Sequence, residues 1–270
     1  MQNRLGFIGA GNMAEAIARG VLGAKLYRPA EMIAADVSPQ RREVFADQLK
    51  IRSIEDAQGV VTQCRTVLLC VKPQHMAEML ASVRELVTEE HLVISIAAGI
   101  STKFIQEALK PGLKLRVVRA MPNTPMLVNK GMVAICPGAH ATAEDMAEAK
   151  RIFAAAASVV EVREELMNAV TAVSGSGPAY FFYLVEQMER AGVEMGLTPQ
   201  QAHQLVTQTA RGAAEMLCTS TDSPEELRRK VTSPGGTTHA AITTMQERGM
   251  PAIVVDALKA ACRRGAELGK

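Results

Sequence analysis

Near its N-terminus the chain reads Arg4-Leu5-Gly6-Phe7-Ile8-Gly9-Ala10-Gly11-Asn12-Met13-Ala14. A short apolar strand runs directly into Gly-x-Gly-x-x-Ala, and a helical pattern of apolar residues follows. Gly9 allows a tight turn, Gly11 lets the backbone approach a pyrophosphate at the helix N-terminus, and small Ala14 permits close packing of helix and strand. This order of strand, turn and helix predicts a Rossmann-type dinucleotide-binding domain. The residues expected to contact the cofactor here are Gly9, Ala10, Gly11, Asn12 and Met13.

The next predicted strand, Met32-Ile33-Ala34-Ala35, ends at Asp36, where the adenosine end of a dinucleotide is expected. An acid at this place binds the ribose 2′-hydroxyl of NADH, whereas an arginine accommodates the 2′-phosphate of NADPH. The chain offers both kinds of group, because Ser38 and Arg41 follow Asp36 closely. The hydroxyl and the cation favour NADPH, and NADH stays open. In an alternative interpretation Ser38 only starts a helix, and the arginines form its solvated face.

Length and composition are typical of an ordinary soluble enzyme. The 270 residues are enough for two domains, and the net charge of +2 leaves no excess of basic residues for nucleic-acid binding. Five cysteines and five histidines are scattered without metal-ligand spacing, so no metal site is expected. No signal peptide and no apolar run near twenty residues is present, which predicts a cytoplasmic protein without a membrane partner.

Strands and helices alternate through the first half of the chain. Apolar strands are expected at 66–71, 92–97 and 115–120, and a helix at 75–87. Continuous apolar strands separated by helices are typical of a parallel sheet that is covered on both faces. Ligands bind such sheets outside the carboxyl ends of the strands. That rule selects five more residues for the cofactor: Val71, Lys72, Pro73, Ala97 and Asn123.

The pattern becomes purely helical after about residue 162. We therefore expect a cofactor-binding domain over residues 1–161 and an all-α domain over residues 162–270. The expected helices are 164–173, 179–195, 199–217, 224–231, 240–248 and 251–268. A stretch rich in Ser and Gly lies at the start of the second domain, and Ser176 within it either faces a ligand or makes a tight helical contact.

The segment from Val231 to Thr238 places hydroxyls and two glycines directly before a helical run. A helix N-terminus with unpaired N–H groups and neighbouring hydroxyls is suited to a small carboxylate. Ser, Thr, Pro and Gly also occur in ordinary caps and turns, so the segment alone leaves both interpretations open.

Five motifs occur in order along the chain, and together they resemble the pyrroline-5-carboxylate reductase family. They are Gly-Phe-Ile-Gly-Ala-Gly-Asn-Met-Ala, Val-Lys-Pro at 71–73, Met-Pro-Asn-Thr-Pro at 121–125, Ser-Gly-Ser-Gly-Pro-Ala-Tyr at 174–180 and Ser-Pro-Gly-Gly-Thr-Thr at 233–238. The resemblance implies NAD(P)H-dependent reduction of the cyclic imine 1-pyrroline-5-carboxylate to L-proline, the final step of proline biosynthesis. It also implies a homodimer formed by the helical domains, in some members assembled into larger rings. Ala57 departs from the family, because some members have an asparagine there that contacts the cofactor.

The expected chemistry is consistent with the residues themselves. Related dehydrogenases that reduce a carbonyl use a general acid, commonly a lysine on the long helix after the sheet, and residues 174–196 contain no lysine. An imine needs less help, because its nitrogen can arrive protonated and its reduction leaves a neutral amine. We expect Thr238 to hydrogen-bond the ring nitrogen, either only orienting it or also relaying a proton. The residues expected to hold the carboxylate are Ser233, Gly235, Gly236 and Thr237, and Ser176 is a further substrate-binding candidate.

Two other functions stay open. One is reduction of another small cyclic imine or a keto acid, since discrimination by ring size is worth only about 1–3 kcal/mol. Alternatively, the chain is a non-catalytic redox sensor that binds NADP, although such a protein has no need for a substrate loop.

Overall fold

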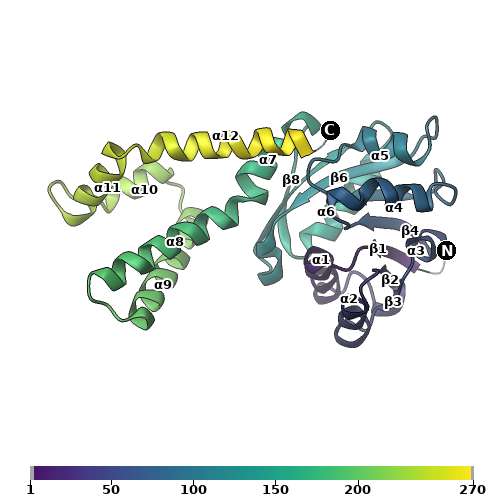
Figure 1. Ribbon diagram of the computed structural model, residues 1–270, viewed down its shortest axis with the longest axis horizontal. Coiled ribbons are helices and arrows are strands. Elements are labelled where there is room, and N and C mark those ends of the chain that lie inside the picture. The colour runs from purple at the N-terminus through teal and green to yellow at the C-terminus, as the bar shows by residue number, and fades with distance from the viewer. Residues whose placement is uncertain (1–2, 269–270) are drawn as a thin grey trace. The chain divides into compact units, whose positions relative to one another are not determined.

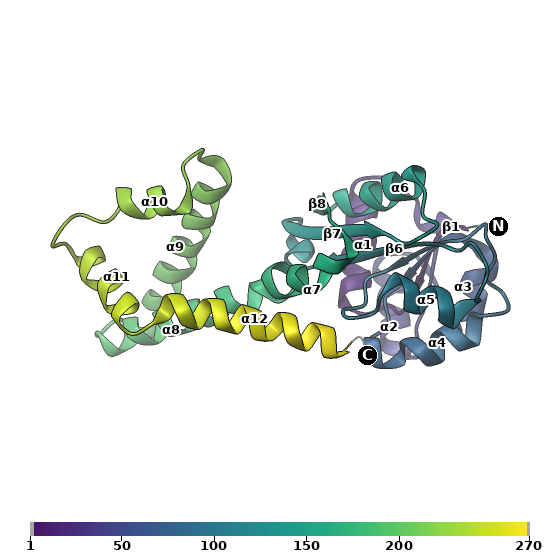
Figure 2. The ribbon, with the colours of Figure 1, turned by 90° about the horizontal axis from the view of Figure 1, so that it is seen from above.

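The computed structural model describes residues 3–268, and its contacts divide the chain into two compact units. The first unit runs to Ser176 and takes up the chain again from Ala261, and the second is Gly177–Ala260. Figures 1 and 2 show that the first unit contains the sheet and that the second consists of helices.

The first unit is built on one eight-stranded sheet with the order β3-β2-β1-β4-β5-β6-β7-β8. Neighbouring strands are parallel except β6 and β7, which are antiparallel. The expected doubly wound, mostly parallel sheet is therefore confirmed. The strands are β1 Asn3–Ile8, β2 Met32–Ala35, β3 Arg52–Ile54, β4 Cys64–Leu69, β5 Leu92–Ser95, β6 Arg116–Pro122, β7 Gly131–Pro137 and β8 Ala157–Glu161.

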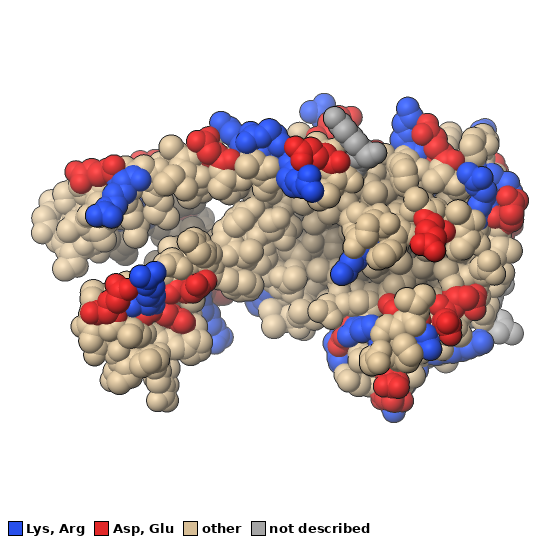
Figure 3. Space-filling model, viewed as in Figure 1, with Lys and Arg blue, Asp and Glu red and all other residues tan. Residues whose placement is uncertain are grey.

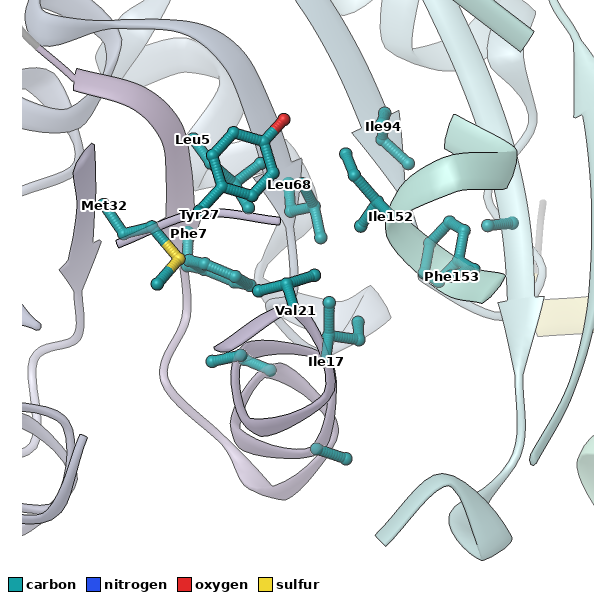
Figure 4. Packing of buried hydrophobic residues seen from close by; sticks show 14 of the residues in the cluster. Leu5, Phe7, Ile17, Val21, Tyr27, Met32, Leu68, Ile94, Ile152 and Phe153 are labelled. Carbon is teal, nitrogen blue, oxygen red and sulfur yellow. The ribbon is translucent and has the colours of Figure 1, made fainter. Parts of the chain in front are cut away.

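Helices cover both faces of the sheet and bury it in two large apolar clusters, and a small third cluster contains Ala134, Cys136 and Met167. One cluster joins β1 and β4 to α1 and α6 and contains Phe7, Ile17, Leu68 and Phe153, which Figure 4 shows in close packing. The other cluster lies under α3, α4 and α5. The helices of this unit are α1 Asn12–Gly23, α2 Pro39–Glu43, α3 Ala57–Gln63, α4 Met76–Val83, α5 Thr102–Leu109, α6 Ala143–Ala154 and α7 Met167–Val170.

Several element bounds differ from those expected. β4 ends at Leu69 and β5 at Ser95, so Val71 and Ala97 lie in the loops that follow these strands. The helix expected at 75–87 is a 3-10 turn followed by the shorter α4. Three strands were not expected, namely β3, β7 and β8. β3 has only three residues and β8 is largely exposed, so neither shows a continuous apolar run.

The second unit contains α8 Gly177–Glu194, α9 Pro199–Thr219, α10 Pro224–Lys230, α11 Thr237–Glu247 and most of α12 Met250–Leu268. The helix expected at 164–173 is wrong as a single element. The chain there makes a 3-10 turn, the one-turn α7 and a π-helical turn, Thr171–Gly175. Among residues 3–268, no helix combines the length and apolar character that crossing a bilayer requires.

Candidate active site

The turn after β1 passes very close to the end of β4, at the point where the strand order reverses. Gly9 has φ +95°, and a Cβ on it would lie 2.8 Å from the carbonyl carbon of Cys70. The Gly9 N–H donates to the carbonyl of Ala35 at 2.7 Å, which also ties the turn to β2. Only glycine fits this backbone without strain. The turn is therefore fixed at the place where doubly wound sheets bind dinucleotides.

Gly11 lies two residues after Gly9, but its surroundings are open where those of Gly9 are crowded. It is the N-cap of α1, it makes no side-chain capping bond, and no atom lies within 4 Å of a Cβ built on it. The start of α1 therefore has no side-chain cap, and the side of Gly11 where a side chain would lie is open. This arrangement fits the pyrophosphate of a dinucleotide, which needs N–H donors and a close approach to the backbone.

Residues after β2 hold the glycine turn through hydrogen bonds to Ala10. The Asp36 carboxylate accepts the N–H groups of Ala10 at 2.7 Å and Ser38 at 2.9 Å. Arg41 Nε donates to the carbonyl of Ala10 at 2.6 Å, and its Nη2 donates to Glu15 at 2.7 Å. The structure thus brings Ala10, Asp36, Ser38 and Arg41 together at the expected adenosine end. Their direct contacts with ribose or phosphate remain predictions.

The alternative interpretation is that Ser38 starts a helix and that the arginines form its solvated face. The first part is confirmed and the second is wrong. Ser38 is the N-cap of α2, and its hydroxyl accepts the N–H of Arg41 at 3.4 Å. The arginines, however, do not form a solvated face. Arg42 donates to the backbone carbonyls of Asp36 and Val37, at 2.8 and 3.1 Å, while Arg41 is bonded to the glycine turn as described above.

The loops after β4, β5 and β6 lie at the same edge of the sheet as the glycine turn. Lys72 is exposed and Ala97 is buried there. Asn123 is 9% exposed, and its amide is already engaged, since Oδ1 accepts the N–H of Met132 at 2.8 Å and Nδ2 donates to the carbonyl of Ser174 at 3.3 Å. Asn123 therefore joins β7 to the segment before α8 and offers less to a cofactor than expected.

Two of the buried cysteines are unreactive thiols, and the described residues contain no metal cluster. Burial raises the pKa of Cys64 and of Cys136 to about 12, so both thiols stay protonated at neutral pH. Residues 3–268 hold no group of three His, Cys, Asp or Glu placed to bind a metal ion.

The predicted substrate segment begins α11 in the second unit. The helix begins at Thr237, earlier than expected, so Thr237 and Thr238 belong to its first turn. Its N-cap is Gly236, which makes no side-chain capping bond, and the turn before it is closed by the Gly236 N–H donating to Ser233 O at 3.0 Å. Gly235 has φ +73°, which favours glycine. The segment thus presents uncapped N–H groups beside the hydroxyls of Ser233, Thr237 and Thr238.

Glu15 is the polar residue of this region that sequence reasoning missed. It lies in the first turn of α1 and binds Arg41 and Arg19. Acidic residues are common in the first turn of a helix, so the position of Glu15 in the sequence does not predict its contact with Arg41. Only the folded structure shows that α2 lies against this turn.

The sheet and its glycine turn define a class of protein, the nicotinamide-dependent oxidoreductases, and comparisons with known proteins agree. Residues 4–99 match the family described as NADP oxidoreductase coenzyme F420-dependent, and residues 164–268 match pyrroline-5-carboxylate reductase dimerisation. The chain is 40% identical to a pyrroline-5-carboxylate reductase of Synechocystis sp., with all of both chains covered.

Solved structures give the same result over the full length. The chain is similar to a pyrroline-5-carboxylate reductase from Coxiella burnetii, with 33% identity, a TM-score of 0.90 and complete coverage of both chains. It is also similar to a Plasmodium falciparum pyrroline carboxylate reductase with NADP bound, with 27% identity, a TM-score of 0.89 and complete coverage of both. The chain belongs to the pyrroline-5-carboxylate reductase family. Its cofactor is NAD(P)H, and its helical region is a dimerisation domain.

Replacing Gly11 with alanine tests the proposed pyrophosphate position. The added methyl group meets no protein atom within 4 Å, so the melting temperature should change little. It occupies the space needed by the cofactor, and we expect the dissociation constant for NADPH to rise by about tenfold or more, measured by calorimetry. The matched control is Gly23→Ala, which also adds a methyl group in open space but at the other end of α1. Equal affinities in the two variants would contradict the proposed position.

Proposed function

We propose that this protein reduces 1-pyrroline-5-carboxylate to L-proline with NADPH, and also with NADH, as the final step of proline biosynthesis. The observation that carries the proposal is the glycine-capped N-terminus of α11 with Thr238 in its first turn. Membership of the family supports the reaction, and the helix end supports the substrate, a small anion with one ring nitrogen.

The two parts of the chain have different roles in this proposal. Residues 1–161 bind the cofactor through the glycine turn, the Asp36–Arg41 segment and the loops after β4, β5 and β6. Residues 162–270 bind the substrate and form the dimer. Within the substrate groups, Ser233 and the N–H groups of residues 235–237 bind the carboxylate, and Ser176 is a further contact.

For this reaction the protein needs mainly to bind the substrate and the cofactor and to orient them. When bound, the reduced nicotinamide supplies a hydride. Thr238 hydrogen-bonds the ring nitrogen, which fixes the face and angle of the C=N bond. A protonated imine accepts the hydride at carbon and becomes a neutral amine, so no strong acid is required. The lysine-free stretch at residues 174–196 is consistent with this.

Dimerisation is expected through the helical unit, because α8 exposes large apolar side chains. Phe181, Phe182 and Tyr183 are 68%, 67% and 66% exposed, and α12 adds Ile253 at 63%. Consecutive exposed aromatics of this size are typical of a surface that a partner covers. On the face shown in Figure 3, charges of both signs are scattered and leave wide uncharged areas. We propose a homodimer, with larger homo-oligomers built from it.

The cytoplasm is the proposed location. All five cysteines are free, including the exposed Cys218 and the partly buried Cys262. Unpaired thiols of this kind suit a reducing compartment.

A steady-state assay tests the reaction directly. We expect oxidation of NADPH and of NADH, followed by absorbance, with the five-membered imino acid pyrroline-5-carboxylate. A six-membered cyclic imino acid or a keto acid should turn over more slowly, and preference for either would redirect the proposal to that substrate. Tight NADPH binding without turnover of any cyclic imine would instead favour the redox sensor.

Thr238→Ala tests the group at the ring nitrogen. Loss of one hydrogen-bonding group that acts on the reacting atoms typically lowers kcat about a hundredfold or more, while the NADPH dissociation constant should stay nearly unchanged. Thr238→Ser keeps the hydroxyl and should retain most of the activity. Thr243→Ala, on the same helix, controls for loss of a threonine methyl and hydroxyl. An unchanged kcat in Thr238→Ala would remove this residue from the mechanism.

Phe181→Asp tests the dimer surface. Because the side chain is exposed within one chain, a charge there should leave the fold of the unit intact but oppose burial at an interface. We expect a shift from dimer to monomer in light scattering after size exclusion. Phe104→Asp adds the same charge at a partly exposed phenylalanine of α5 and should remain dimeric. A dimeric Phe181→Asp would place the interface elsewhere.

A further inference from the structure

The turn that is proposed to hold the cofactor is fixed by two opposite charges. Asp36 accepts the N–H of Ala10 at 2.7 Å, and Arg41 donates to the carbonyl of the same residue at 2.6 Å. Both peptide groups that flank the Ala10 α-carbon are therefore held by the segment after β2. The Arg41 side chain is partly buried in this arrangement, with 26% of it exposed.

Glu15 determines where the Arg41 guanidinium lies. Its carboxylate accepts Arg41 Nη2 at 2.7 Å and Arg19 Nε at 2.9 Å, and it is 17% exposed. Burial raises the pKa of Glu15, but the hydrogen bonds and charges of the two arginines outweigh this and hold that pKa below its usual range. The carboxylate is therefore ionised at neutral pH and can form an ion pair with Arg41.

This pairing lowers the net positive charge of the segment that is proposed to bind the adenosine ribose. Of the two cations there, Arg41 pairs with Glu15, while Arg42 donates to the backbone carbonyls of Asp36 and Val37 and lies 3.8 Å from the Glu55 carboxylate. The negative charge of the Asp36 carboxylate is also present in this segment, and it repels a phosphate. A 2′-phosphate that binds Arg41 shares the guanidinium with Glu15, whereas a 2′-hydroxyl has no need of that cation.

We propose that Glu15 is a specificity-determining residue for the cofactor, which holds Arg41 on the glycine turn and thereby reduces the advantage of NADPH over NADH. The inference rests on the proposed cofactor site. It goes beyond that site because Glu15 acts through Arg41. Glu15 lies on α1, outside the Asp36–Arg41 segment that is proposed to bind the ribose.

Calorimetric binding of NADP⁺ and NAD⁺ without substrate measures this effect apart from catalysis. In Glu15→Gln, Arg41 is released from its carboxylate partner. We expect the ratio of dissociation constants, NAD⁺ over NADP⁺, to rise about tenfold, with kcat/KM for the reduced cofactors following the same direction. Glu43→Gln is the matched control, because Glu43 is exposed on the same helix as Arg41 and forms no ion pair within residues 3–268. It should leave the ratio unchanged.

A double-mutant cycle isolates the contact from a general charge effect. In an Arg41→Gln background, Glu15→Gln should no longer change the ratio. A change that persists there, or one that Glu43→Gln reproduces, would overturn the proposal. Melting temperatures check folding, which this partly exposed pair should affect little.

Failure of the inference can be told from failure of the cofactor site itself. If Gly11→Ala and Arg41→Gln weaken NADP⁺ binding but Glu15→Gln leaves the ratio unchanged, only the role of Glu15 is wrong. If neither Gly11→Ala nor Arg41→Gln affects either nucleotide, the cofactor binds elsewhere and the site is wrong as well.

Discussion

The close approach of Gly9 to the end of β4 is the constraint on which the proposed site depends. A Cβ at Gly9 would lie 2.8 Å from the Cys70 backbone, so the chain can leave β1 and enter α1 at this place only through glycine. The position of α1 then follows, with Ile17 and Val21 packed in the same cluster as Phe7 and Leu68. A loose turn would leave the first N–H groups of α1 without a fixed direction, and an anion would have no defined place to bind.

Polar groups near this turn fall into two kinds, and the difference separates structural from ligand-binding roles. The side chains of Asp36, Arg41 and Asn123 are all hydrogen-bonded within the protein. The first N–H groups of α1 and α11 have no side-chain cap. The hydrogen-bonded side chains hold the backbone in place. The N–H groups at the uncapped helix ends are donors that a bound anion can use. This contrast favours anion binding at the helix ends and an indirect role for some side chains that the motifs select.

Much of the fold could be predicted from the sequence, because long apolar strands and the glycine motif depend on local patterns. The short β3 and the exposed β8 could not, since their pairing is decided by neighbouring strands. For the site, the glycines could be predicted because Gly9 and Gly235 need backbone conformations that other residues avoid. The partners of Arg41 could not, because Glu15 lies 26 residues earlier and meets it only through tertiary packing.

The caps of the helices give a physical reason to treat the two glycine-capped ends alike. In the described part of the chain, six helices have a Ser, Thr or Asp side chain that caps the N-terminus, at residues 38, 56, 101, 142, 198 and 223. Such caps are worth about 1 kcal/mol each, and Gly11 and Gly236 forgo the side-chain bond. The N–H groups left uncapped at these ends suit a pyrophosphate at α1 and a carboxylate at α11. A reductase of an anionic imine needs two anion sites, and the two glycine-capped helix ends lie one in each of the two units.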